Sequence, residues 1–251
     1  MWLILTFALG LVAVVFFGQK HLIYPTMMTY PRANFHSKYL VTGTKYACLY
    51  RPALNESQPT VVFYHGNCEN IFSRGESIIS SIPEDYGGVC VIEYHGYSVL
   101  KSQSGTNWEQ IVGSVIAGLE CNGINMENVV HIGYSLGTAV ALRVVKHFGT
   151  HGRGVHLIAP FTSIKEIVCD HLLWPFAKLV SQLVRENIDS LEVAKTLPPS
   201  QNVVVYGCLN DEIVPYKQSI LIANALKATF HTWNCKHNDF DIPFKEILEI
   251  N

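Results

Sequence analysis

The sequence predicts an α/β fold in which a mostly parallel sheet is flanked by helices. Short apolar runs alternate with segments of helical length along most of the 251 residues, which suit one α/β domain. The chain is 49% hydrophobic but only 15% charged, and buried parallel strands would absorb so much apolar material. One apolar run, from Val129 to Ile132, leads into the sharp turn Gly133 to Gly137 and then into a helix of small residues. A strand, a tight turn and a helix in direct succession are typical of this class.

The N-terminal residues differ from the rest of the chain. No residue from Trp2 to Phe17 is charged, and the stretch has no polar stripe and no basic residue before it. We therefore expect residues 1–18 to form an uncleaved transmembrane signal-anchor helix and residues 19–37 to form a linker, although a cleaved signal peptide and a buried helix are alternatives. The folded domain is expected to span residues 38–251.

Two signals disagree about the side of the membrane on which this domain lies. Lys20, Arg32 and Lys38 follow the apolar stretch and favour the cytoplasmic side. The sequence Asn55-Glu56-Ser57 is an acceptor site for N-glycosylation and favours the opposite side. The sequence therefore predicts a single-pass membrane protein and leaves its orientation open.

The remaining elements follow in a regular order. A hairpin is expected over 38–50, around Thr42-Gly43-Thr44. Buried strands are expected at 60–64, 88–94, 129–134, 154–159 and 203–206, and a last strand at 229–233. Helices are expected at 71–82, 107–119, after residue 135, at 216–227 and at 243–250.

Gly133-Tyr134-Ser135-Leu136-Gly137 matches the Gly-x-Ser-x-Gly pattern of a nucleophile elbow. The two glycines suit a strained turn in which side chains next to the serine would clash. Ser135 is therefore the candidate nucleophile, and the alternative is a serine that only caps the following helix. Ser98 is a much weaker candidate because it lacks the glycine frame.

Backbone amides near Ser135 could stabilise an oxyanion. The N–H of Leu136 begins a helix, whose dipole favours negative charge. The strand at 60–64 runs into His65-Gly66-Asn67, where the amide of Asn67 could supply a second donor. The alternative for Asn67 is an ordinary helix cap in a turn.

A carboxylate and a histidine follow Ser135 in the order expected of a triad. Asp211 lies in the loop after a late strand and is the candidate acid, with Glu212 as its alternative. His237 lies just past the last strand and is the candidate general base. The chain has eleven histidines, but only His237 combines this order with this location; His131, His156 and His231 lie within strands and are expected to pack there.

The segment from about residue 170 to residue 197 is expected to be helical in pieces, with a break at Pro175. Leu172, Trp174 and Phe176 contribute to a strongly apolar face. This face either packs on the sheet or forms a small lid that touches lipid or an acyl chain.

Taken together, these motifs resemble the α/β-hydrolase family, and within it the membrane-anchored serine hydrolases that include protein depalmitoylases and lysophospholipid or monoacylglycerol lipases. The matching segments are Gln19 to Pro25, Phe63 to Asn67, Glu93 to Ser98, Gly133 to Gly137, Asp211 to Pro215 and His237 to Asp239. The chain departs from the family pattern at Glu93 and His95, where Asp and Arg are usual. The resemblance implies an ester or thioester hydrolase that acts on a lipid or an acylated protein.

Composition excludes other classes of function. The net charge of −2 gives no basic surface for nucleic acid. The seven cysteines are scattered and form no Cys-x-x-Cys motif, so a zinc or redox site is not expected, and the chemistry needs no cofactor. Two alternatives to a membrane-anchored serine hydrolase remain: a serine peptidase of the same fold, and a non-catalytic binding protein.

Overall fold

A computed structural model describes residues 19–21, 23–24, 37–100, 106–172, 176–186, 188–239 and 241–249. Its sheet has eight strands in the order β1-β2-β4-β3-β5-β6-β7-β8. The strands are β1 (Leu40–Thr42), β2 (Ala47–Arg51), β3 (Thr60–Tyr64), β4 (Gly88–Ile92), β5 (Val129–Tyr134), β6 (Gly154–Ile158), β7 (Val203–Cys208) and β8 (Thr229–Trp233). From β4 to β8 all neighbours are parallel, whereas β1 and β2 form the antiparallel hairpin that the sequence predicts.

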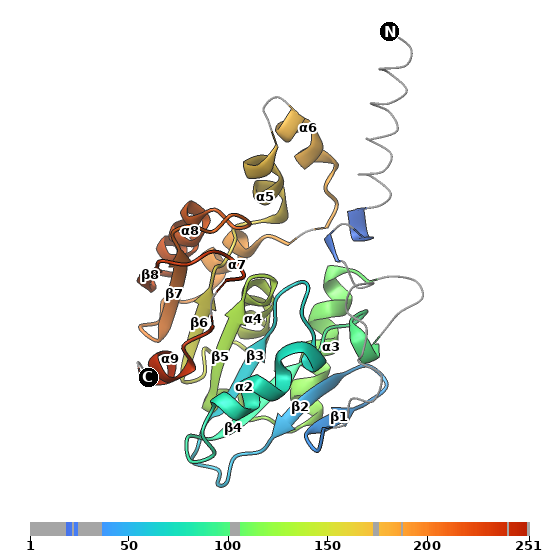
Figure 1. Ribbon diagram of the computed structural model, residues 1–251, viewed down its shortest axis with the longest axis vertical. Helices are drawn as coiled ribbons and strands as arrows, with labels where there is room; N and C mark the ends of the chain where they lie inside the picture. Colours follow the sequence, from blue (N-terminus) through green and yellow to red (C-terminus); the bar gives the residue numbers. More distant parts are fainter. Residues whose placement is uncertain are drawn as a thin grey trace.

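Helices cover both faces of the sheet (Figure 1). The helices are α2 (Glu76–Ser81), α3 (Trp108–Cys121), α4 (Leu136–Phe148), α5 (Ile164–His171), α6 (Phe176–Leu183), α7 (Ser190–Thr196), α8 (Tyr216–Leu226) and α9 (Phe244–Glu249). Side chains of α3, α4, α7 and α8 share one apolar cluster with one face of the strands. Side chains of α2, of the π-helical turn before it (Ile71–Gly75) and of α9 pack on the other face. The prediction of a mostly parallel sheet flanked by helices is confirmed.

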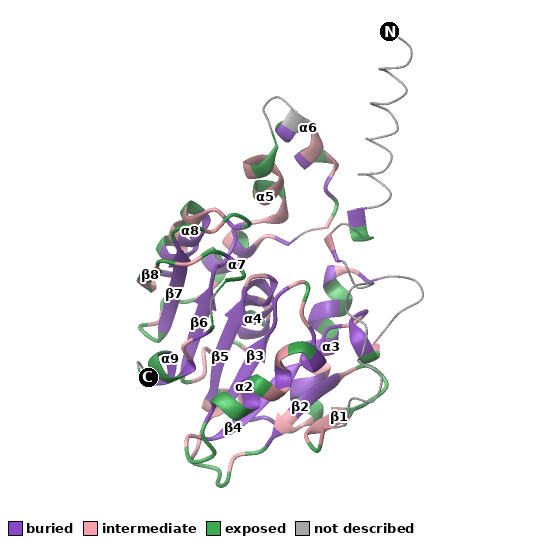
Figure 2. Ribbon diagram, viewed as in Figure 1, coloured by how far each residue is buried: buried purple, intermediate pink, exposed green. Residues whose placement is uncertain are grey.

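Burial along the sheet is uneven (Figure 2). Every residue of β4, β5, β6 and β7 is buried. Their unbroken apolar runs follow from their position, because parallel strands with helices on both sides have no face in water. By contrast, no residue of the edge strand β8 is fully buried. Ser135 and His237 follow β5 and β8, respectively. The two candidate residues are therefore attached to strands that differ greatly in burial.

Helices α5 and α6 stand away from the sheet and contact one another (Figure 1). No residue of α5 is fully buried. The end of α5 is nevertheless tied to the body of the protein: Asp170 forms an ion pair with Lys217 and accepts a hydrogen bond from Gln218 of α8, and His171 Nε2 donates to the carbonyl of Ile213 at 2.7 Å. These two helices overlap the segment in which a lid is expected.

The described part of the presumed linker packs against the domain. Tyr24 is buried and its hydroxyl donates to Glu186, while the Gln19 side chain contacts the backbone of residues 183 and 185. Among the described residues, no helix is long and apolar enough to cross a bilayer. The expected transmembrane helix, residues 1–18, lies outside the described residues.

Candidate active site

Ser135 occupies a strained turn between β5 and α4. Its backbone has φ 51° and ψ −116°, a conformation that costs a non-glycine residue about 1–3 kcal/mol. Gly133 and Gly137 allow the turn to close. A Cβ on Gly137 would lie 1.9 Å from the carbonyl oxygen of Tyr64, and one on Gly133 would lie 2.7 Å from that of Gly137. The glycine pattern thus reflects close backbone packing between this turn and β3.

The structure brings Ser135, Asp211 and His237 together. His237 Nε2 lies 2.9 Å from Ser135 Oγ, and His237 Nδ1 lies 2.7 Å from Asp211 Oδ2. The imidazole therefore contacts a hydroxyl with one nitrogen and a carboxylate with the other, as a general base requires. The side chains of His237 and Asp211 are only 4% and 1% exposed. Exclusion of water strengthens their electrostatic contact.

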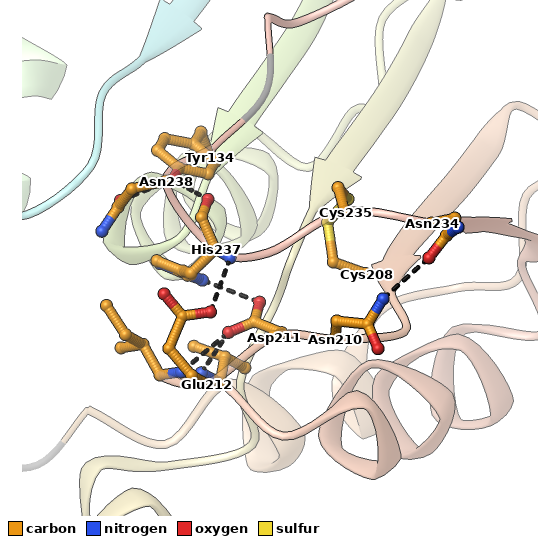
Figure 3. Close-up of a disulfide and its surroundings, with 11 residues drawn as sticks. Tyr134, Cys208, Asn210, Asp211, Glu212, Asn234, Cys235, His237 and Asn238 are labelled. Atoms are coloured by element: carbon orange, nitrogen blue, oxygen red, sulfur yellow. Dashed lines mark hydrogen bonds and ion pairs between the residues drawn. A yellow bond between two sulfur atoms is a disulfide. The ribbon is translucent and has the colours of Figure 1, made fainter.

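The acid loop fixes the orientation of Asp211 (Figure 3). Its Oδ1 accepts hydrogen bonds from the backbone N–H groups of Ile213 at 2.9 Å and Val214 at 2.7 Å. Its other oxygen, Oδ2, is thus left for the histidine. Glu212, the alternative acid, contacts the backbone N–H of His237 at 3.2 Å. Of the two carboxylates, Asp211 is the one paired with the imidazole ring.

A disulfide bond joins the acid loop to the histidine loop (Figure 3). It links Cys208, the last residue of β7, to Cys235, and their Cα atoms are 5.1 Å apart. This pairing was not predicted from the sequence, because the cysteines are scattered and form no Cys-x-x-Cys motif. Cys208 ends β7 and Cys235 follows β8, so the pairing can be inferred only when β7 and β8 are known to be neighbours.

Asn67 and Leu136, the two candidate oxyanion donors, lie at the ends of neighbouring strands. Leu136 is the first residue of α4, so its N–H has no acceptor within the helix. The side chain of Asn67 donates to the carbonyl of Ile23 at 2.6 Å and accepts from the hydroxyl of Tyr97 at 2.6 Å. The next helical turn is capped by Asn70 instead. Asn67 is therefore part of a fixed turn and does not cap that helix.

A buried polar network supports this turn from behind. Glu93 accepts hydrogen bonds from the hydroxyl of Ser98 and from the backbone N–H groups of Ile71 and Tyr94. Its Oε1 also lies 2.9 Å from His65 Nε2, and His65 Nδ1 contacts the carbonyl of Gly66 at 2.8 Å. Both oxygens of Glu93 and both ring nitrogens of His65 therefore have hydrogen-bond partners. The hydroxyl of Ser98 is thus engaged in this network.

Tyr134 connects the nucleophile turn to the histidine loop (Figure 3). Its hydroxyl donates to the backbone carbonyl of His237 at 2.5 Å and lies 3.0 Å from Asn238 Oδ1. Its ring stacks on that of His237, with 5.5 Å between centroids. Burial and the nearby Glu69 carboxylate raise the pKa of Tyr134 well above its usual value, so the hydroxyl remains a donor. The sequence offered no signal for this role.

An apolar pocket of about 300 Å³ opens between α5, α6 and the N-terminal segment. Its walls include Ile23, Ile164, Val168, Val180 and Val184. The backbone of Ile23 is the same group that contacts the side chain of Asn67, so the pocket adjoins the candidate oxyanion turn. Within the described ranges, no group of three or more His, Cys, Asp or Glu side chains could hold a metal ion.

Comparisons with known proteins agree with this architecture. No family model matches the chain. The protein bem46 of Schizosaccharomyces pombe is 26% identical, in an alignment that covers 88% of this chain and 80% of that protein. An alpha-beta hydrolase from Vibrio vulnificus superposes with a TM-score of 0.63 at 16% identity, covering 91% of this chain and 86% of the other. An esterase from Rhodococcus superposes with a TM-score of 0.60 at 18% identity, covering 84% and 95%. The chain thus has the α/β-hydrolase fold.

Proposed function

We propose that this protein is a membrane-anchored serine hydrolase that cleaves an ester or thioester of a lipid or lipidated substrate. The observation that carries the proposal is the line of contacts from Ser135 Oγ through the His237 ring to Asp211, at 2.9 and 2.7 Å. A serine that only caps a helix would need neither the strained turn nor the buried imidazole–carboxylate pair. No metal or organic cofactor takes part in the proposed chemistry.

The reaction proceeds by acyl transfer in two steps. His237 removes the proton of Ser135, whose oxygen attacks the substrate carbonyl, while Asp211 stabilises the imidazolium. The backbone amides of Leu136 and Asn67 donate to the developing oxyanion. His237 then protonates the leaving alcohol or thiol, and an acyl-serine remains. Water, deprotonated by the same histidine, attacks the acyl-serine and releases the acid.

Labelling with a fluorophosphonate probe tests the nucleophile. The full chain in detergent is compared with Ser135→Ala and with Ser77→Ala, which removes an exposed serine of α2. Labelling and esterase activity are expected in the wild type and in Ser77→Ala. In Ser135→Ala, labelling should vanish and kcat should fall by roughly 10⁴-fold or more.

Other outcomes favour the remaining alternatives. A folded wild type that resists the probe in detergent would indicate a non-catalytic binding protein of this fold. Probe labelling combined with cleavage of peptides, and not of esters, would indicate a serine peptidase.

The apolar pocket supports an acyl chain as the substrate's recognised part. Apart from Gln19 and His171, the residues that line it are aliphatic, and it adjoins the oxyanion turn through Ile23. Each methylene buried there contributes up to about 0.8 kcal/mol, or about fourfold in kcat/KM. Polar substrates would lack this contribution.

A series of esters with acyl chains of increasing length tests this assignment. The value of kcat/KM should rise with chain length until the pocket is full. Val168→Ser, a change within the pocket wall, should flatten the rise, whereas Leu221→Ser should not, because Leu221 is an exposed apolar residue on α8. An identical rise in both variants would place the acyl chain elsewhere.

Membrane anchoring by residues 1–18 is the third part of the proposal. It is supported by the uncharged stretch from Trp2 to Phe17 and by the packing of Gln19 and Tyr24 beside the α6 end and the oxyanion turn. An anchor at this position would bring the pocket close to the bilayer. The protein should stay in the membrane fraction after carbonate extraction, and a form that begins at residue 19 should not.

A further inference from the structure

The Cys208–Cys235 disulfide joins the two loops that carry Asp211 and His237 (Figure 3). Asp211 follows the first cysteine by three positions, and His237 follows the second by two. A displacement of either loop would therefore change the distance between Asp211 Oδ2 and His237 Nδ1, which is 2.7 Å.

The strand that precedes the histidine loop lies at the edge of the sheet. No residue of β8 is fully buried, and β8 has a neighbour only on the β7 side. Three hydrogen bonds also join the loops. The backbone N–H of Leu209 donates to the carbonyl of Trp233, and the backbone N–H of Asn210 donates to the carbonyl of Cys235. The side-chain amide of Asn210 donates to the side-chain oxygen of Asn234. Asn210 and Asn234 are exposed, so water competes for the last of these. Among the described residues, this is the one disulfide bond, and it joins these two loops.

We infer that this disulfide positions Asp211 against His237, so that hydrolysis depends on the oxidised state of Cys208 and Cys235. The inference rests on the proposed serine hydrolase function. Cys208 and Cys235 are positioning residues, because the hydrogen bonds between Ser135, His237 and Asp211 do not involve either sulfur. Cys235 is half-buried, whereas Cys208 is buried.

Reduction follows ordinary thiol–disulfide exchange. A thiolate of dithiothreitol attacks one sulfur, a mixed disulfide forms, and the other cysteine leaves as a thiolate. The second thiol of dithiothreitol then closes its own disulfide and releases the remaining cysteine. The products are two protein thiols and one oxidised dithiothreitol.

The experiment measures kcat and KM for a short soluble ester, and the rate of fluorophosphonate labelling, on the full chain in detergent. The wild type is assayed oxidised, reduced by dithiothreitol, and reoxidised by oxidised glutathione. The double variant Cys208→Ser/Cys235→Ser is treated in the same way, and Cys121→Ser, which removes an exposed free cysteine, is the matched control.

Reduction and the double variant should each lower kcat by roughly 10- to 100-fold, because small misplacements of catalytic groups have effects of that size. The KM should change less than about twofold, since the substrate pocket is formed by other elements. Reoxidation should restore the wild type, and dithiothreitol should have no further effect on the double variant.

Two results would overturn the inference: a reduced wild type with unchanged kcat, or an equal loss in the double variant on adding dithiothreitol. Circular dichroism on the reduced wild type shows that the protein assayed is folded, even if the double variant is not. Failure of the oxidised wild type to react with the probe would instead count against the proposed function itself.

A separate observation concerns the loop that precedes β3, at the end of the parallel strands opposite to the candidate catalytic residues. Asn55, Glu56 and Ser57 lie in the loop between β2 and β3, and all three are exposed. The Ser57 hydroxyl donates to Asn55 Oδ1 at 2.5 Å. No other Asn-x-Ser/Thr sequence occurs in the chain. This loop precedes β3, whereas the candidate catalytic residues follow the ends of parallel strands, so a bulky group at Asn55 would not cover the site.

We propose that Asn55 carries an N-linked glycan and that the domain folds in the secretory pathway. The disulfide agrees with this, because such bonds persist in oxidising compartments and are rare in the cytosol. In the reaction, the Asn55 side-chain nitrogen takes the oligosaccharide from a lipid diphosphate donor. A new N–C bond forms as the bond from sugar to phosphate breaks; the amide nitrogen loses one proton, and the lipid diphosphate leaves.

Expression of the full chain in eukaryotic cells tests this assignment. Digestion with peptide-N-glycosidase should shift the wild type by the mass of one glycan. Asn55→Gln should migrate at the digested position, and Asn224→Gln, an exposed asparagine on α8 outside any such sequence, should behave like the wild type. A wild type that does not shift would refute the glycan. Maleimide labelling of both Cys208 and Cys235 in unreduced cells would refute the oxidising compartment.

Discussion

The two halves of the candidate site are stabilised in different ways. Ser135 follows β5, a fully buried strand with neighbours on both sides, and its turn packs against β3 so closely that Gly137 has no room for a Cβ. Asp211 and His237 follow β7 and β8, at the edge of the sheet, where a disulfide and hydrogen bonds join their loops.

The difference shows how position in a sheet determines what a functional loop requires. In the centre, burial on both faces and contact with neighbouring strands fix a turn without direct cross-links. At the edge, one side of the strand has no neighbour, so loops need specific bonds to keep an atom in place. Tyr134 joins the two halves, because it lies on β5 and its hydroxyl donates to the backbone of His237.

A large effect on kcat is expected when the two carboxylates of the acid loop are changed one at a time. Asp211→Asn should lower kcat by roughly 10³- to 10⁴-fold, because the amide no longer stabilises the imidazolium or selects the correct tautomer. Glu212→Gln should lower kcat less than about tenfold, because Glu212 accepts a hydrogen bond from the backbone N–H of His237 and not from its ring. Steady-state kinetics on a soluble ester would measure both. A larger loss of kcat in Glu212→Gln than in Asp211→Asn would indicate that Glu212, and not Asp211, is the acid of the triad.

The packing of the nucleophile turn can be tested with a pair of glycines. Gly137→Ala should destabilise the protein by about 3 kcal/mol or more and abolish activity, because the new methyl would overlap the carbonyl of Tyr64. Gly113→Ala lies in α3, where nothing is within 4 Å of the new methyl, and should stabilise the protein by about 0.5–1 kcal/mol. Urea denaturation would measure both changes. A Gly137→Ala protein of normal stability would contradict the close packing described here.

Burial of β5 also predicts how stability depends on pH. Burial lowers the pKa of His131 to about 3, from 6.5 in the unfolded chain. Between pH 6.5 and pH 3 the unfolded state therefore binds a proton that the folded state does not bind. The free energy of unfolding is highest above pH 6.5 and decreases as the pH falls from 6.5 towards 3. Between pH 7.5 and pH 5 the loss should be about 2 kcal/mol.

Denaturation of the wild type and of His131→Asn at several pH values would measure this loss. The variant should show a flatter dependence on pH, whereas His147→Asn, at the exposed surface of α4, should keep the wild-type dependence. Equal slopes in all three proteins would exclude His131 as the cause.

The smallest expected effect concerns the bridge between the two halves. Tyr134→Phe removes the hydroxyl that donates to the His237 carbonyl, a bond worth about 1 kcal/mol, and should lower kcat by about fivefold. Tyr216→Phe removes an exposed hydroxyl bond to Thr232 on the outer surface and should leave kcat unchanged. The same rate assay would compare them. No change in Tyr134→Phe would mean that the two halves keep their alignment independently.

Much of the fold could be predicted from the sequence because its signals are local. Apolar runs marked the buried strands, and the glycine pattern around Ser135 marked the sharp turn. The position of His131 within an apolar run also distinguished it from His237, which lies in a loop. Ser135 was proposed on its glycine pattern, and Asp211 and His237 on chain order and position; in the structure the three side chains lie within hydrogen-bonding distance.

The parts that sequence reasoning missed depend on which elements become neighbours. The Cys208–Cys235 bond requires β7 beside β8, and the Tyr134 contact requires the histidine loop to return over β5. The contact from Asn67 to Ile23 joins segments that no local pattern connects. Strand order arises from the packing of the whole sheet, and a single sequence carries little direct information about it.

The disulfide also determines how the chain behaves when it is cut. Cys208 and Cys235 enclose the acid loop, α8 and β8. A protease that cuts once between them, for example in the turn between α8 and β8, produces two fragments that remain covalently joined. Such a nicked protein runs as one band on a gel without reductant and as two bands after reduction, so limited proteolysis reports the state of this bond without any chemical label.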